Sequence, residues 1–457
     1  MRQYLLILVL WAIVGLSANW PEPIEDPGYF DIPPSPQREG NPAAGYHYLL
    51  YGDVVRSGIP LALFQPSLGK SGDDLGRTGD SQRLPYMFNA VEAPNGVKVA
   101  APTCLTCHAE QINGQLVIGL GNTTADYSRP TPSSLFDKMV EMRYGKDSPE
   151  WAAYLPFSRS QKALAPYIRT SVRGLNPADK IFAVLAAHRH PDDLRWIDSA
   201  QFQLPLEVVP TDVPAWWLLK KKNALYYNAL GRGDFARLSS ASAMLTLTDS
   251  AEARRVDERM VDLIAWIRTL QPPKYPFPVD EALAAQGKAI FEKNCSKCHG
   301  TYGATPSYPN RVVALERIGT DPLLAQTYGN YPEYHRWYNR SWFAQGPHRA
   351  ELKPTNGYIA PPLDGIWATA PYLHNGSVPT VADLLHSTQR PKYWRRSFDA
   401  NDYDPERLGW RYRTEEKPSG SETYDTTLPG HSNSGHTFGD RLTDHERRAV
   451  IEYLKTL

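Results

Sequence analysis

The clearest helical pattern of apolar and polar positions lies at the carboxyl end of the chain. Over Leu442–Leu457, apolar residues recur at helical spacing, and charged residues fill most positions between them. This spacing predicts an amphipathic helix with one buried face. Thr443 or Asp444 can cap its first turn, because both side chains accept hydrogen bonds from free backbone N–H groups. The apolar positions are Val450, Ile451, Leu454 and Leu457.

Two further segments carry related patterns. Met260–Leu270 parallels the last helix and ends in Arg-Thr-Leu, where the chain itself ends in Lys-Thr-Leu. Gly287–Cys295 predicts a shorter helix. Between them, Gln271–Pro278 contains four prolines, which predict a stiff extended linker. We therefore place a domain boundary near residue 275.

The amino-terminal apolar run has a different character. Tyr4–Leu16 follows a basic residue and precedes the small residues Ser17 and Ala18. This order predicts a signal peptide, which we assign to residues 1–18, and a periplasmic or secreted protein. An uncleaved anchor is the alternative, because Leu16 stands where cleavage favours a small residue. The run is short for a membrane span, and we expect no span in the mature chain.

Composition limits the classes of function. The chain has 457 residues, enough for two or three domains, and 42% of them are hydrophobic. Lysine plus arginine number 49 and aspartate plus glutamate number 49, so the net charge is zero. This balance gives no sign of a nucleic-acid partner. Forty prolines and 32 glycines predict many loops between the helices.

A five-residue motif, Cys-x-x-Cys-His, occurs twice, at Cys104–His108 and Cys295–His299. It is the attachment signature of c-type haem, in which two thiols bond to one porphyrin and the His supplies an axial nitrogen. A zinc site needs four ligands close together, and a thioredoxin-like pair does not need the His. We therefore predict two covalent haems. The attachment residues are Cys104, Cys107, Cys295 and Cys298, all the cysteines in the chain, and the proximal ligands are His108 and His299.

The motifs stand at matching distances from the two similar helices. His108 precedes Leu270 by 162 residues, and His299 precedes Leu457 by 158. These intervals indicate two copies of one domain plan, so we expect a mainly α fold of two cytochrome c-like domains, each around one covalent haem, with long loops. The expected division is an extended arm over residues 19–45, a first domain with large insertions over residues 46–274 and a second domain over residues 275–457.

The sixth ligand decides whether an iron only passes electrons or also binds small molecules. Ahead of the last helix, Gly435-His436-Thr-Phe-Gly439 stands where many small cytochromes c have Met-Pro-x-Phe-Gly. The chain has no Met after Met260. We therefore predict His436 as the distal ligand of the second iron, which gives a bis-His centre of lowered potential.

A second segment carries a family resemblance. Pro371-Tyr-Leu-His374-Asn-Gly-Ser resembles the Pro-Tyr-Met-His-Asp-Gly-Ser stretch of bacterial di-haem cytochrome c peroxidases, whose Met ligates the carboxy-terminal haem. Here Leu373 replaces that Met and cannot bind iron, which argues against the usual peroxidase chemistry. The resemblance implies that His374 contacts a haem propionate or the backbone. Ligation of the second iron by His374 is the alternative.

Within that superfamily, the chain is most similar to the rubber oxygenase branch of di-haem cytochromes c. The similarity covers most of residues 45–457. It rests on the segment around His374, on Gly435–Gly439 and on Lys220–Phe235. It implies a bis-His relay at the carboxy-terminal haem and a first haem at which dioxygen can bind. Calcium between the domains, as in some relatives, is a further expected cofactor.

For the first haem, the same resemblance implies an open or labile distal position. Met244 is an alternative ligand, although a Met among apolar neighbours more often packs in a core. His188 or His190 is a weaker alternative. The related proteins place a Trp between their haems as an electron relay, and we assign this role to Trp216 or Trp217.

These observations predict an exported di-haem c-type cytochrome. Electrons would enter at the second haem and reach the first, which would activate peroxide or dioxygen. The alternative is a plain electron carrier with both irons six-coordinate. The expected partners are a small redox protein and a small oxidant.

Overall fold

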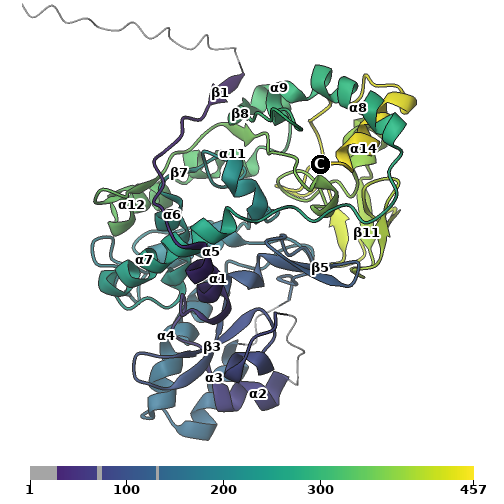
Figure 1. Ribbon diagram of the computed structural model, residues 1–457. Helices are drawn as coiled ribbons and strands as arrows, with labels where there is room; N and C mark the ends of the chain where they lie inside the picture. The colour runs from purple at the N-terminus through teal and green to yellow at the C-terminus, as the bar shows by residue number, and fades with distance from the viewer. Residues whose placement is uncertain (1–27, 69–74, 130–132) are drawn as a thin grey trace, which may run out of the picture.

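The computed structural model describes residues 28–68, 75–129 and 133–457. The predicted signal peptide, residues 1–18, and the first part of the predicted arm lie outside these ranges. In Figure 1, α2, α3, α4 and β3 form the lower part of the molecule, α8 and α14 lie at the upper right, and β11 lies below them on the right. Among the helices that the structure describes, none is long and apolar enough to cross a bilayer.

The three helices predicted from periodicity are confirmed. They are α7 (Ser250–Ile267), α8 (Glu281–Asn294) and α14 (Asp444–Leu454). Thr443 caps α14, since its side chain accepts a hydrogen bond from the Glu446 N–H while the Glu446 carboxylate accepts one from Thr443. The expected cap therefore sets where the last helix begins.

Each half of the chain contains a crossed pair of helices. In the first half, α1 (Pro42–Tyr51) packs on α7, and in the second half, α8 packs on α14. An added Cβ at Gly45 in α1 would lie 2.0 Å from the Asp262 carbonyl oxygen, and one at Gly287 in α8 would lie 1.8 Å from the Ala449 carbonyl oxygen. Only glycine allows the helices to approach so closely. A glycine at the helix crossing of each half agrees with two copies of one helical arrangement.

The remaining α-helices of the described residues are short or belong to the insertions. They are α2 (Leu61–Leu68), α3 (Ser133–Tyr144), α4 (Pro149–Leu164), α5 (Ala178–Ala187), α6 (Phe235–Ser240), α9 (Ser296–His299), α10 (Leu315–Ile318), α11 (Leu323–Asn330), α12 (Glu333–Arg340) and α13 (Val381–Leu384).

The strands form small antiparallel sheets. Three have three strands: β2 (Ile59–Pro60), β4 (Lys98–Pro102) and β3 (Phe88–Glu92); β1 (Tyr29–Asp31), β8 (Arg311–Ala314) and β10 (Gly357–Ile359); and β14 (Tyr412–Thr414), β11 (Tyr393–Arg396) and β15 (Thr423–Asp425). The pairs are β5 (Ala109–Ile112) with β6 (Gln115–Ile118), β7 (Gly231–Gly233) with β9 (Ala350–Leu352), and β12 (Tyr403–Asp404) with β13 (Gly409–Trp410).

The prediction of a mainly α fold is wrong. Helix accounts for 38% of the structure and strand for 14%, spread over several small sheets. Strands of two to five residues are too short to show a clear alternation of apolar and polar positions. Several of them also pair with segments far away in sequence, as β1 does with β8, so no local sequence pattern predicts them.

The two halves are interlocked through these pairings. The arm reaches across to the second half, where β1 pairs with β8, and β7 of the first half pairs with β9. Trp337 and Tyr338 of α12 are buried in the same apolar cluster as Leu105 and Met244. Packing thus crosses the predicted boundary near residue 275, and the division into two domains stays a prediction.

Candidate haem sites

Both Cys-x-x-Cys-His motifs fold as a single helical turn. The His108 N–H donates to the Cys104 carbonyl at 3.0 Å, and the His299 N–H donates to the Cys295 carbonyl at the same distance. Residues three and four apart share one side of a helical turn, so each motif presents two thiols and an imidazole together. The first motif follows β4, and the second follows α8. Both local folds suit attachment of one porphyrin.

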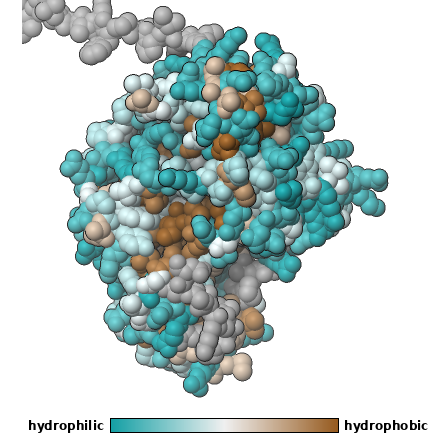
Figure 2. Space-filling view, turned by 45° about the vertical axis from the view of Figure 1, so that its right-hand side comes forward, coloured by the Kyte–Doolittle hydropathy of each residue, from teal (hydrophilic) through white to brown (hydrophobic). Residues whose placement is uncertain are grey.

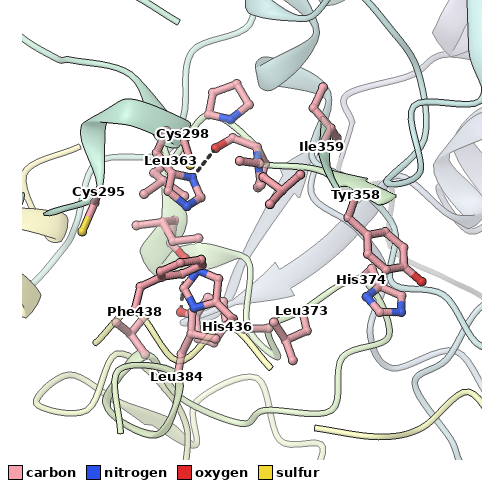
Figure 3. Close-up of a pocket in the computed structure, with 18 of the residues that line it drawn as sticks. Cys295, Cys298, Tyr358, Ile359, Leu363, Leu373, His374, Leu384, His436 and Phe438 are labelled. Carbon is pink, nitrogen blue, oxygen red and sulfur yellow. Dashed lines mark hydrogen bonds between the residues drawn. The ribbon is translucent and has the colours of Figure 1, made fainter. Parts of the chain in front are cut away.

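The second motif opens into a cavity of about 350 Å³. Figure 3 shows Cys295 and Cys298 on one side of it, with His436 and Phe438 from the loop before α14 below. Phe438 is 41% exposed, so the cavity reaches the molecular surface. The walls are largely apolar, as a porphyrin ring requires. They include Phe291, Leu363, Ile366, Val381, Leu384, Leu385, Leu442, Val450 and Leu454.

The imidazoles of His299 and His436 face each other across this cavity. Their ring centroids are 6.2 Å apart. Metal–imidazole bonds are about 2.0 Å long, so two imidazoles on opposite sides of one metal ion have centroids about 6.3 Å apart. The observed separation therefore fits one iron between the two rings.

The imidazole rings of His299 and His436 are both held in the neutral form that binds a metal. Burial lowers the pKa of His436 to about 3 and also lowers the pKa of His299. His299 Nδ1 lies 2.8 Å from the Pro361 carbonyl, and as a donor it leaves Nε2 free for a metal. The Nδ1 atom of His436 is buried with no hydrogen-bond partner among the described residues.

The loop that carries His436 is fixed by Arg390, a residue that the sequence did not single out. Its guanidinium donates hydrogen bonds of 2.6 to 3.2 Å to carbonyl oxygens on both flanking segments. The acceptors are Asp383, Leu384, Asn433, Gly435 and His436. Because a single cation ties α13 to the ligand loop, His436 is held toward His299.

His374 lies in the same cavity but away from His436. Its ring stacks on Tyr358 with centroids 4.0 Å apart, and Figure 3 shows Leu373 between His374 and His436. Burial lowers the pKa of His374 to about 3. The ring opposite His299 is therefore that of His436, and this geometry favours His436 over His374 as the distal ligand.

Charged groups also line this otherwise apolar cavity. The Tyr227 hydroxyl donates to Asp212 at 2.7 Å, and burial raises the pKa of that carboxyl to about 7. Lys222 lines the cavity too, and burial lowers its pKa to about 8. A haem joins an apolar ring to two carboxylates, so a wall that is mostly apolar with a few buried polar groups fits it.

The first motif lies largely inside the protein. Cys104, Cys107 and His108 lie deep within the protein, yet each keeps some accessible surface. The Asn176 amide donates to Cys107 Sγ at 3.3 Å, and the buried His108 Nδ1 has no partner in the described parts of the chain. Burial raises the pKa of Cys104 to about 11 and lowers that of His108 to about 3. The set suits thioether attachment and one neutral axial nitrogen.

Met244 is completely buried in the first apolar cluster, which also contains Leu105 of the motif. Its backbone carbonyl accepts hydrogen bonds from the buried Arg189 guanidinium. This position fits core packing. Ligation by Met244 and an open site both stay predictions.

Trp216 and Trp217 lie between the two sites. Trp216 stacks on His108 with ring centroids 4.6 Å apart. Trp217 is 1% exposed and donates its indole N–H to the Asp364 carbonyl at 2.7 Å, in the wall of the second cavity. Trp216 therefore contacts the imidazole of His108, and Trp217 is hydrogen-bonded to Asp364, a residue that lines the second cavity.

Elsewhere in the described residues, no three His, Cys, Asp or Glu side chains meet so as to hold a metal ion. The four cysteines are unpaired. These facts fit the expectation that all four thiols serve haem attachment. The expected calcium stays a prediction.

Figure 2 shows apolar surface gathered in two areas of a mostly hydrophilic face, and such areas often mark binding sites.

Two family models match the chain in its second half. Residues 282–335, which include the second motif, match the model for cytochrome c oxidase, cbb3-type, subunit III. Residues 357–395, which include His374 and Arg390, match the model described as RoxA-like, cytochrome c-like. These matches support a cytochrome c family with covalently bound haem c and haem-based electron transfer. Cytochrome c domains are typically extracytoplasmic.

Two curated relatives from Sinorhizobium fredii are similar to the chain. Uncharacterized protein y4iJ is 32% identical over 253 residues, which cover 41% of this chain and 41% of the relative. Uncharacterized protein y4iM is 26% identical over 318 residues, which cover 59% of this chain and 69% of the relative. The match thus spans less than half of the first relative.

Proposed function

We propose that the protein is a periplasmic di-haem c-type cytochrome that moves electrons between two covalent haems. The facing imidazoles of His299 and His436, 6.2 Å apart across an apolar cavity, carry this proposal. Two imidazole ligands give a low-spin centre with little reorganisation, which suits a relay. The second haem is the entry point for electrons, since its cavity reaches the surface beside Phe438.

The Trp216–Trp217 pair connects this relay to the first haem. Trp217 contacts the wall of the second cavity and Trp216 stacks on His108, so the pair supplies a short covalent link between the sites. The first haem, with His108 as its proximal ligand, activates peroxide or dioxygen at an open or labile distal position. A carrier with both irons six-coordinate is the second candidate, because Met244 is buried in the same cluster as Leu105 of the motif.

Haem counting and spectroscopy test the proposal. The secreted protein should contain two covalent haems per chain, and a chain with Cys104→Ala and Cys107→Ala should contain one. His436→Ala should convert the second haem from low spin to high spin, while His374→Ala should leave it low spin. The reverse result would transfer the ligand role to His374.

The first haem separates the two candidates. Its spectrum should change when carbon monoxide, cyanide or peroxide is added to the otherwise unaltered protein. Purely low-spin spectra that none of these ligands alters would establish the electron carrier. In that case Met244→Ala should open the first haem, which identifies the ligand that had closed it.

A further inference from the structure

A line of aromatic rings leads from His108 to the molecular surface. Trp216 stacks on His108, and Trp266 meets the edge of Trp216 with ring centroids 6.4 Å apart. Tyr46 in turn stacks on Trp266, with centroids 5.2 Å apart. The Tyr46 side chain is 37% exposed, so the line ends in solvent.

The helix crossing of the first half builds the outer part of this line. Tyr46 follows Gly45, the residue at which α1 approaches α7, and Trp266 lies in the last turn of α7. The close approach at Gly45 brings the phenol over the indole. Trp216 precedes Trp217, which is hydrogen-bonded to Asp364 in the wall of the second cavity, so Trp216 is a branch point with one arm toward the second site and one toward the surface.

We propose that Trp266 and Tyr46 form a second electron port, which connects the first haem to solution without passing through the second haem. The proposal rests on the proposed function only in taking the first motif to carry a haem. Aromatic side chains in contact shorten the gaps that an electron must cross, and tyrosine and tryptophan are the side chains most easily oxidised by one electron. The line supplies such rings without interruption from the axial imidazole to the exposed phenol.

The step transfers one electron and no net proton. When a strong one-electron oxidant in solution takes an electron from Tyr46, the phenol O–H bond breaks and its proton passes to water. An electron from the reduced first haem then crosses Trp216 and Trp266 to the phenoxyl radical, which takes a proton back from water. The haem is oxidised by one electron and the oxidant is reduced by one.

Flash oxidation of the reduced holoprotein tests the port without using peroxide or dioxygen. Under anaerobic conditions, a ruthenium tris-bipyridine photosensitiser with persulfate as acceptor generates the oxidant within a laser pulse. Oxidation of the first haem is followed by its absorbance. We expect a fast phase in the unaltered protein that slows at least tenfold in Tyr46→Leu and in Trp266→Leu, whereas Trp266→Phe, which keeps a ring, should slow it less.

Tyr331 supplies the matched control. It is 41% exposed, and no ring contact joins it to Trp216 or Trp266 within the described residues. Tyr331→Leu should therefore leave the fast phase unchanged. A fast phase that survives both Tyr46→Leu and Trp266→Leu would overturn the port. If the fast phase depends on both residues but the first haem ignores peroxide and other added ligands, the port stands and peroxide or dioxygen activation is rejected.

Discussion

Removal of Arg390 should release the loop that carries His436. The guanidinium donates to five carbonyl oxygens, of Asp383, Leu384, Asn433, Gly435 and His436. A hydrogen bond to a charged donor is worth about 1.5–3 kcal/mol, but this site is only partly buried, so water can satisfy some of the freed carbonyls. We therefore expect Arg390→Ala to lower the free energy of unfolding by about 3–5 kcal/mol.

The change should also reach the second iron. With the loop released, His436 no longer faces His299 at a fixed distance, and part of the second haem should become high spin and bind carbon monoxide. Denaturant titration measures the stability, and the visible spectrum measures the ligand state. Arg390→Lys should have an intermediate effect, because an ammonium has only three donors.

Arg441→Ala is the control for this prediction. Arg441 is exposed and lies five residues after His436, so its removal should change neither quantity. The reasoning is refuted if Arg390→Ala loses less than about 1 kcal/mol and keeps a fully low-spin spectrum. It is also refuted if Arg441→Ala behaves in the same way as Arg390→Ala.

Two other predictions follow from the packing and from the buried charge. Gly287→Ala should destabilise the α8–α14 crossing by about 3 kcal/mol, because its Cβ would meet the Ala449 carbonyl at 1.8 Å. Gly329→Ala is the control: no heavy atom lies near its added Cβ in α11, so it should be neutral or slightly stabilising. Thermal melting measures both variants. Burial raises the pKa of Asp212 to about 7, and reduction of the nearby iron should raise it further by favouring the neutral acid. The midpoint potential of the second haem should therefore be constant below this pKa and fall as the pH rises above about 7, by at most about 59 mV per unit, and Asp212→Asn should abolish the slope in a redox titration.

The expected site residues differ in how they could be recognised. The Cys-x-x-Cys-His motifs are local in sequence, because two thioethers and one axial bond require neighbouring residues on a single turn. The prediction of His436 came from the likeness of Gly435–Gly439 to the Met-containing loop of small cytochromes c and from the absence of any Met after Met260. The role of Arg390 could not be predicted from the chain, since it depends on carbonyl oxygens contributed by residues 383–384 and 433–436.

The sequence likewise did not show how the two sites are connected in space. Trp216 and Trp217 were chosen by resemblance, and only the fold shows that Trp216 stacks on His108 while Trp217 is hydrogen-bonded to Asp364. Trp266 and Tyr46 are ordinary apolar-face and surface residues in their helices. They become a connected line because α1 and α7 cross at Gly45.

The sequence by itself determined the positions of the two Cys-x-x-Cys-His motifs and three helices, α7, α8 and α14, and it led to the prediction of His436 as a ligand. These depend on contacts within a few residues or on a regular period, both of which a linear chain displays. The tertiary structure alone decided the share of strand, the interlocking of the halves, and the clamp on the ligand loop. These depend on hydrogen bonds and packing between residues far apart in sequence, whose partners are defined only once the chain has folded.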